Sequence, residues 1–165
     1  MEPAIIRATS NDAEALTEIA HAAKRHWGYP ETWIAAWRDT LTMSPEFITT
    51  NVAYMAVENE RPVGFYVLTK EPDGLHLDHL WILPPAMGRG IGRALCEHAA
   101  AEANRLGFHS MKIEADPNAE AFYKRMGAVR VGTSTSETCG ERRELPLMEF
   151  RIPVEAGRTN APHAP

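Results

Sequence analysis

The chain has 165 residues, of which 44% are apolar, so its size and composition fit a single domain with its own core. The net charge is −5 and no long basic run occurs, which argues against nucleic acid as the principal partner. No apolar run approaches a membrane span, and the start, MEPAII, lacks the segments of a signal peptide. Cys96 and Cys139 form no spacing motif, so we expect reduced thiols in a cytoplasmic protein without a membrane partner.

The first third of the chain predicts one strand and two helices. The strand is Ala4–Ala8, and Ser10 and Asn11 can cap the helix that follows. Apolar residues recur at helical spacing until Gly28 and Pro30 end this helix: Leu16, Ile19, Ala20 and Ala23. The second helix has one apolar face, with Pro45 beyond its end: Trp33, Ile34, Trp37 and Leu41.

The middle of the chain predicts three strands, which are Asn51–Glu58, Val63–Lys70 and Leu75–Leu83. The segments between them, Asn59–Pro62 and Glu71–Gly74, contain the residues that favour turns. The strands therefore form an antiparallel meander. A helix follows, closed by Gly107, with these residues on its buried face: Ile91, Leu95, Ala99, Ala103 and Leu106.

The last part of the chain predicts three strands and a helix. After the strand Met111–Ala115, Asp116 can cap a helix that has Pro117 at its first position. Two strands follow, joined by a polar loop, and the end of the chain is expected to be disordered. The strands are Val129–Thr133 and Leu147–Ile152, the loop is Ser134–Glu144, and the disordered tail is Glu155–Pro165.

The order of these elements predicts an α/β fold with a mixed sheet. Leu75–Leu83 and Met111–Ala115 are joined through a helix, and a right-handed crossover of this kind makes the two strands parallel. The other neighbouring strands are antiparallel. We therefore expect one domain over residues 4–153, with a central twisted sheet of about seven strands and helices on both faces.

The stretch Leu80–Arg93, LWILPPAMGRGIGR, joins an apolar strand to a helix. Glycine lets the backbone approach a ligand closely, and a helix start presents free N–H groups and the positive end of its dipole. Arg89 and Arg93 add charged donors. The stretch therefore predicts a site for phosphate oxygens, built around three glycines: Gly88, Gly90 and Gly92.

This loop does not fit two other phosphate-binding patterns. A dinucleotide fingerprint, G-x-G-x-x-G, would need glycine in place of Arg93 or Leu95, and the Gly-Lys-Ser/Thr of a P-loop is missing. Met87–Gly92 instead resembles the acetyl-CoA loop of the GNAT (GCN5-related) N-acetyltransferases, written Q/R-x-x-G-x-G/A. Met87 stands where the family has Gln or Arg, which puts a side-chain contact from that position in doubt but not backbone donation.

A second segment, Asp116–Gly127 (DPNAEAFYKRMG), is similar to a GNAT segment in which an Asn near a helix start and a Tyr one turn later contact CoA. The element order over residues 4–153 is also that of the family. The resemblance implies an acetyl-CoA-dependent N-acetyltransferase. It places acetyl-CoA along these residues: Leu80, Trp81, Ile82, Leu83, Met87, Gly88, Arg89, Gly90, Ile91, Gly92, Arg93, Asn118, Phe122 and Tyr123.

The resemblance also implies catalytic roles. Backbone N–H groups around Leu80–Leu83 would bind the developing oxyanion. Tyr123 would protonate the leaving thiolate, because a phenol stays protonated at neutral pH; the alternative is a core aromatic beside Phe122. The candidates for the base are Asp78, then Glu114, then His79, and each can equally be a structural hydrogen-bonding group.

The acceptor in the family lies under the first two helices and their linker. Here Trp27 and Tyr29 flank Gly28 in that linker, so we expect them, with Asp78 and His79, to bind an apolar or cationic amine. We expect no metal at His76–His79, because strand alternation puts His79 on the face opposite its two potential partners.

The sequence leaves three functions open. The first is direct acetyl transfer to a primary amine, with a small-molecule acceptor favoured over a protein. The second is a CoA-binding module of the same fold without transfer activity, and the third is a nucleotide-phosphate binder of another fold. An acyl-cysteine route is not expected, because no His is placed to activate Cys96 and Cys139 lies in a polar loop. Dimers are common in the family, which leaves a homodimer open.

Overall fold

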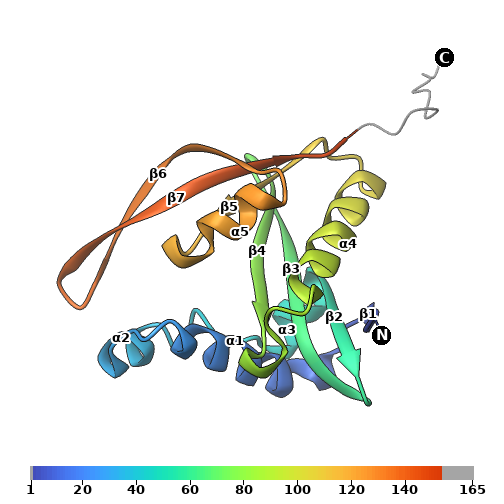
Figure 1. Ribbon diagram of the computed structural model, residues 1–165, viewed down its shortest axis with the longest axis horizontal. Coiled ribbons are helices and arrows are strands. Elements are labelled where there is room, and N and C mark those ends of the chain that lie inside the picture. Colours follow the sequence, from blue (N-terminus) through green and yellow to red (C-terminus); the bar gives the residue numbers. More distant parts are fainter. Residues whose placement is uncertain (1, 154–165) are drawn as a thin grey trace.

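A computed structural model describes residues 2–153 as a seven-stranded mixed sheet in the order β1-β2-β3-β4-β5-β7-β6 (Figure 1). All neighbouring strands are antiparallel except β4 and β5, which are parallel. The strands are β1 (Ala4–Arg7), β2 (Val52–Glu58), β3 (Arg61–Glu71), β4 (Gly74–Ile82), β5 (Ser110–Glu114), β6 (Val129–Thr138) and β7 (Glu141–Arg151). The predicted fold class is confirmed.

Five α-helices and three 3₁₀ turns accompany the sheet in the described range. The helices are α1 (Ala13–His26), α2 (Glu31–Ala36), α3 (Pro45–Thr50), α4 (Ile91–Arg105) and α5 (Glu120–Arg125). The 3₁₀ turns are η1 (Ser10–Asp12), η2 (Pro84–Ala86) and η3 (Pro117–Ala119). None of the helices within residues 2–153 combines the length and apolar character needed to cross a membrane. The tail Glu155–Pro165, predicted to be disordered, lies outside the described residues.

The core has two halves, one on each face of the sheet. Phe65 and Val67 of β3 pack with Leu16 of α1, whereas Tyr66 and Leu68 pack with Leu95 of α4. Successive β3 residues face opposite sides, and helices cover both sides, so the middle of this strand is a continuous buried run. The two-sided burial explains why the middle of the chain reads as apolar rather than alternating.

The second predicted helix is wrong in extent. The structure ends α2 at Ala36, and the chain continues through turns until a separate helix, α3, begins at Pro45. Tertiary contacts oppose one continuous helix, because the Trp37 indole donates to Thr138 Oγ1 at 3.2 Å and Leu41 enters the core. Ser44 caps α3 by accepting from Phe47 N at 3.0 Å, so Ser44-Pro45 is a helix start that the prediction missed.

The predicted loop Ser134–Glu144 is also wrong, because β6 and β7 form one long hairpin through it. The strands turn at Cys139 (φ 49°) and Gly140 (φ 82°), the two left-handed residues of a tight hairpin turn. The buried side chains near the tip are polar, namely Thr138 and Arg143, so the sequence there shows no apolar alternation. Its β-branched threonines nevertheless favour a strand.

The parallel pair β4–β5 determines where the functional site lies. These strands are in register at one pair of residues only, His76 and Lys112, and they diverge toward their carboxyl ends. The crossover helix α4 starts beyond the end of β4, and η3 starts beyond the end of β5. The divergence therefore leaves an opening between the two segments that the sequence singled out.

Candidate active site

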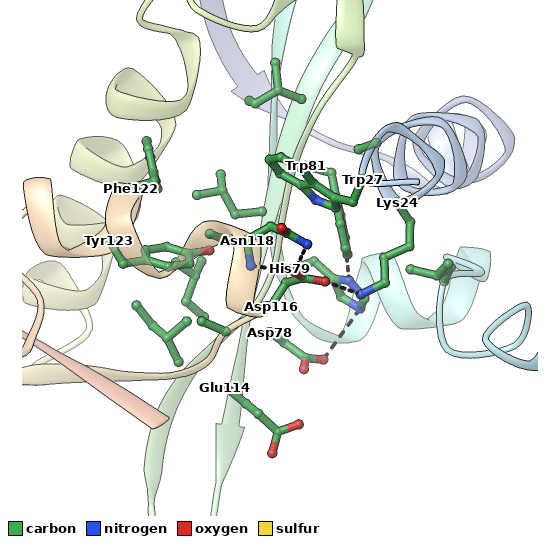
Figure 2. Close-up of a pocket in the computed structure, with 18 of the residues that line it drawn as sticks. Lys24, Trp27, Asp78, His79, Trp81, Glu114, Asp116, Asn118, Phe122 and Tyr123 are labelled. Atoms are coloured by element: carbon green, nitrogen blue, oxygen red, sulfur yellow. Dashed lines mark hydrogen bonds and ion pairs between the residues drawn. The ribbon is translucent and has the colours of Figure 1, made fainter. Parts of the chain in front are cut away.

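A cavity of about 1260 Å³ occupies this opening. It is lined by the end of β4, the glycine loop, the start of α4, the end of β5, and α5. Residues of α1, the segment after α2, and the β6–β7 hairpin complete the wall. Figure 2 shows side chains from opposite walls pointing toward one another, with Tyr123 on one side and Lys24 on the other. The site therefore joins segments from both halves of the chain.

The glycine loop brings bare backbone to the cavity. Gly88 and Gly90 have φ angles of +77° and +83°, and a Cβ on either would meet no atom within 4 Å. Gly90 is the N-cap of α4, so the first N–H groups of that helix start here without intrahelical acceptors. The geometry combines unpaired donors, a positive dipole end and open space, which is what an anionic group requires.

Some of the remaining loop residues line the cavity, and the others only pack within the protein. Gly92 is needed for packing, because a Cβ there would lie 3.2 Å from the Phe122 ring. Arg89 pairs with Glu58 of β2 and Ile91 is buried in the core, and neither lines the cavity. The loop side chains that reach the cavity are those of Met87 and Arg93.

The β4 backbone offers donors to the opening. Leu83 N donates to Val63 O at 2.8 Å, so this N–H points to β3 and is occupied. N–H groups alternate sides along a strand, which turns those of Leu80 and Ile82 away from β3 and toward the opening. Leu80, Trp81 and Ile82 line the cavity, whereas Leu83 does not.

Tyr123 projects into the cavity from α5 (Figure 2). Only 6% of the residue is exposed, and its hydroxyl hydrogen-bonds to no other residue of the described chain. Every fully buried side-chain nitrogen or oxygen within residues 2–153 has a hydrogen-bond partner. The Tyr123 hydroxyl has none in this range, so it must be accessible from the cavity. Burial raises the pKa of Tyr123, so the phenol keeps its proton and can donate it.

Asp78 and His79 lie together because β4 carries a bulge. Val67 of β3 is opposite His79 and Leu68 is opposite Leu77, so Asp78 has no cross-strand partner. The prediction that strict alternation places Asp78 and His79 on opposite faces of the strand is therefore wrong at this bulge. Asp78 Oδ2 lies 3.8 Å from His79 Nε2. No group of three or more His, Cys, Asp or Glu residues in the described part of the chain is arranged to hold a metal.

One ring nitrogen of His79, Nδ1, accepts a hydrogen bond, and the other, Nε2, faces Asp78 at 3.8 Å. The Trp81 indole, which can only donate, bonds to His79 Nδ1 at 2.9 Å, so the neutral ring carries its hydrogen on Nε2, facing Asp78. Burial lowers the pKa of His79 and favours this neutral form. His79 therefore has no lone pair free for a substrate proton, whereas the Asp78 carboxylate is half exposed in the cavity wall.

Glu114 and Trp27 reach the cavity, but Tyr29 does not line it. The Glu114 carboxylate points away from the side chains around Lys24 in Figure 2. Trp27 is 38% exposed at the rim. Tyr29 lies behind the wall, where its hydroxyl donates to Asp116 at 2.9 Å and burial raises its pKa to about 12.

Asp116 is the centre of a buried network that the sequence did not reveal. Lys24 Nζ lies 2.6 Å from Asp116 Oδ2, and Arg143 Nη2 donates to Tyr29 Oη at 2.9 Å. Asn118 Nδ2 donates to Tyr29 Oη at 3.1 Å and to Asp116 Oδ1 at 3.0 Å, which leaves the Asn118 carbonyl oxygen as the free acceptor. The network holds Asn118 in one orientation at the cavity wall.

Only part of this network had a signal in the sequence. Lys24 follows Ala20 by four residues, so helical spacing places it on the buried face of α1. Asp116 was predicted as a helix cap, and it does accept from Asn118 N at 2.8 Å. Arg143 fell in the segment predicted to be a loop, where neither its direction nor its burial could be inferred.

We expect Asp116→Asn to lower the free energy of unfolding by about 3 kcal/mol at pH 7, because Lys24 would be left buried without its counter-ion. Burial acts to raise the pKa of Asp116, but Lys24 and several hydrogen bonds outweigh it and hold that pKa below its usual value. A group with a lowered pKa stabilises the fold above its unfolded value of about 4 and loses that contribution as pH falls through the folded value. The deficit should therefore shrink below about pH 4.

Urea unfolding at pH 7 and at pH 3 measures this difference. Glu144→Gln, at an exposed ion pair on β7, is the control and should change stability little at either pH. A deficit for Asp116→Asn that is the same at both values would show that the carboxylate is not charged and paired.

Comparison with known proteins identifies the family. Residues 13–128 match the acetyltransferase (GNAT) family. The peptidyl-lysine N-acetyltransferase YjaB of Salmonella typhimurium is 31% identical over 142 residues, covering 74% of this chain and 91% of the relative. A GCN5-related N-acetyltransferase structure from Rhodopseudomonas palustris has a TM-score of 0.78 at 24% identity, covering 92% and 97% of the two chains.

A second solved structure, the PaiA N-acetyltransferase of Thermoplasma acidophilum in complex with coenzyme A, has a TM-score of 0.73 at 20% identity. It covers 92% of this chain and 99% of that one. At these identities the two structures show a shared fold. Together with the family match and the Salmonella relative, they show that this chain belongs to the GNAT family and is an N-acetyltransferase.

Proposed function

We propose that the chain transfers an acetyl group from acetyl-CoA directly to a primary amine within the β4–β5 opening. One observation carries this proposal: the opening holds unpaired loop and strand donors, the Tyr123 hydroxyl and the Asp78 carboxylate in one cavity. The coenzyme A complex of the PaiA structure supports the choice of cofactor. Met87 replaces the family's Gln or Arg, but this change of side chain leaves the backbone N–H donors of the loop in place.

Acetyl-CoA fits the donors and acceptors along the opening. Its pyrophosphate would lie on the loop amides at Gly88–Arg93, next to the N-terminus of α4. Its pantetheine arm, which carries two amide groups, would take the place of a strand beside β4 and accept from the Ile82 N–H, while the Leu80 N–H stays available for the oxyanion. The free carbonyl oxygen of Asn118 would accept from a pantetheine N–H.

The transfer requires two proton movements. The attacking amine adds to the carbonyl carbon and forms the new C–N bond, which gives a tetrahedral oxyanion that the Leu80 N–H would stabilise. The C–S bond then breaks as the C=O bond forms again. Asp78, directly or through water, takes the proton that the amine loses, and Tyr123 gives a proton to the leaving thiolate. Cys96 is buried and Cys139 lies at the hairpin tip, outside the cavity wall, so the acetyl group would pass directly to the amine without an acyl-cysteine.

The acceptor end of the cavity favours an amine. Four carboxylates outside the Asp116 network line the wall and attract an ammonium group: Asp39, Asp78, Glu114 and Glu137. The name of the Salmonella relative supports a primary amine as well, because a lysine side chain carries one. We propose a small-molecule amine as the acceptor, with peptidyl-lysine as the second candidate on the strength of that relative.

A thiol-release assay with acetyl-CoA tests the proposal across small amines, amino acids and lysine peptides. We expect amine-dependent release of CoA thiol from at least one class. Tight CoA binding without release from any class would instead make the chain a CoA-binding module. Binding of ATP or NAD in preference to CoA would remove the cofactor assignment.

Gly90→Ala should weaken CoA binding by about tenfold, because its methyl group would lie between the loop backbone and the phosphates. Gly107→Ala is a matched control at the other end of α4, with φ +89° and equally open space around the added Cβ. Each variant should lose about 1 kcal/mol of stability from its left-handed backbone. Calorimetry that shows the same CoA affinity in both variants would place the phosphates elsewhere.

Tyr123→Phe removes only the proton donor. We expect kcat to fall by about 10²–10⁴-fold, while CoA affinity changes little because the ring still packs beside Phe122 at 5.2 Å. Tyr54→Phe, on β2 and outside the cavity wall, is the control for loss of a phenol. A Tyr123→Phe enzyme with unchanged single-turnover rate would leave Tyr123 with a packing role only.

Asp78→Asn tests the base. The acidic limb of the pH–rate profile reports protonation of the base, so this limb should flatten in the variant. His79→Gln, which removes a ring whose one lone pair already accepts from Trp81, should keep the acidic limb even where it lowers the rate. Should the limb persist in Asp78→Asn, the role would pass to Glu114 or to water.

A further inference from the structure

Two buried cations in the cavity wall share one carboxylate. Lys24 Nζ lies 2.6 Å from Asp116 Oδ2, and Arg143 Nη2 lies 4.0 Å from the same oxygen. The side chains of Lys24 and Arg143 are each 10% exposed, and that of Asp116 is 9% exposed. With both cations charged, the group carries one excess positive charge in a place with little water.

Arg143 has donors that no protein group uses. Its Nη2 donates to Tyr29 Oη, but its Nε and Nη1 find no acceptor among residues 2–153. Every fully buried side-chain nitrogen or oxygen in that range has a hydrogen-bond partner, so these two nitrogens must be accessible to solvent. Arg143 is also one of the residues that line the cavity. Nη2 carries two hydrogens and Tyr29 takes one, so the other can act with the neighbouring free Nε or Nη1 as a two-pronged edge, which is suited to a carboxylate.

Aromatic rings hold both cations in place. The Arg143 guanidinium lies 5.1 Å from the Tyr29 ring centre and 4.9 Å from that of Trp37. Lys24 Nζ lies 4.4 Å from the Trp37 ring centre. Burial lowers the pKa of Lys24, as expected for excess charge away from water, and an added anion would relieve that cost. Protein contacts therefore orient both cations without a ligand.

We propose that Lys24 and Arg143 form a carboxylate subsite, and that the acceptor is a small amino acid-like molecule with both a primary amine and a carboxylate. This inference rests on the proposed acetyl transfer. Figure 2 shows Lys24 and Asp116 in the same cavity as Asp78 and Tyr123, so one molecule can present its carboxylate to the cations and its amine toward Asp78. The opposite charges of the two ends of the acceptor match the two regions of the wall.

Two other ligands, a lysine within a peptide and an acyl-CoA with a carboxylate on its acyl group, are weaker candidates for these cations. A lysine side chain within a peptide carries an amine at the end of an apolar chain and brings no carboxylate with it. A dicarboxylic acyl group on CoA would bring a carboxylate on the donor instead. We commit to the acceptor because Lys24 comes from α1 and Trp27 directly follows that helix, and both lie on the side of the cavity opposite Phe122 and Tyr123 (Figure 2).

The test compares matched pairs of acceptors with acetyl-CoA: free amino acids and their amides, which keep the amine and side chain but lose the negative charge. We expect kcat/KM to be at least tenfold higher for the acid of the preferred pair. A lysine peptide blocked at both ends, and succinyl-CoA with an amide acceptor, are the comparison arms. Both should be poorer than acetyl-CoA with the free acid.

Arg143→Gln should raise KM for the acid by about 10–100-fold, remove most of the preference over the amide, and change KM for acetyl-CoA less than twofold. Arg143→Lys keeps the charge without the two-pronged geometry, so it should retain an intermediate preference. Arg142→Gln is the control, because Arg142 is 72% exposed, pairs with Glu144 and lies outside the cavity wall. Melting temperatures show whether each variant is folded.

Equal kcat/KM for acids and amides would overturn the subsite while acetyl transfer stands. Preference for the blocked lysine peptide, or for succinyl-CoA, would overturn it in favour of those ligands. An acid preference that survives in Arg143→Gln would assign the carboxylate to other residues. Absence of turnover with every amine would overturn the proposed function, and this inference with it.

Discussion

β4 and β5 meet at a single pair of residues, His76 and Lys112, and then part. Backbone groups that leave a sheet need other hydrogen-bond partners, and the N–H groups of Leu80 and Ile82 turn toward the opening rather than toward β3. A substrate with a chain of amides can supply those partners. The start of α4, the proposed acid Tyr123 and the proposed base Asp78 would then lie along that substrate, because all of them border the same opening.

The opening is kept in shape by contacts made across it. Asp116, at the end of β5, bonds Lys24 of α1 and Tyr29 of the following linker. On the far side, the tip of the β6–β7 hairpin reaches the α2 region, where Thr138 accepts from Trp37 at 3.2 Å (Figure 1). These ties join helices, sheet and hairpin around the cavity. The bulge at Asp78 changes the direction of one side chain while the strand continues past it.

The sequence predicted the parts whose cause is local. The glycine loop, the β2–β4 meander and α4 follow from turn residues and apolar spacing, and the structure contains them. The β6–β7 hairpin was missed because the side chains buried near its tip, Thr138 and Arg143, are polar and leave no apolar pattern. The bulge and the pairing of Lys24 with Asp116, 92 residues away, depend on contacts between distant segments. Neither follows from spacing, and Arg143 stood in a segment with no predicted structure.

Direct transfer requires acetyl-CoA and the amine to be bound in the opening at the same time, and holding both there removes much of the entropic barrier to their reaction. Initial rates measured over a grid of both substrate concentrations test this requirement. Reciprocal plots should give intersecting lines, as expected when a complex of all three components forms before any product leaves. Parallel lines would mean that the acetyl group first passes to the protein, and would contradict direct transfer between two substrates bound together in the opening.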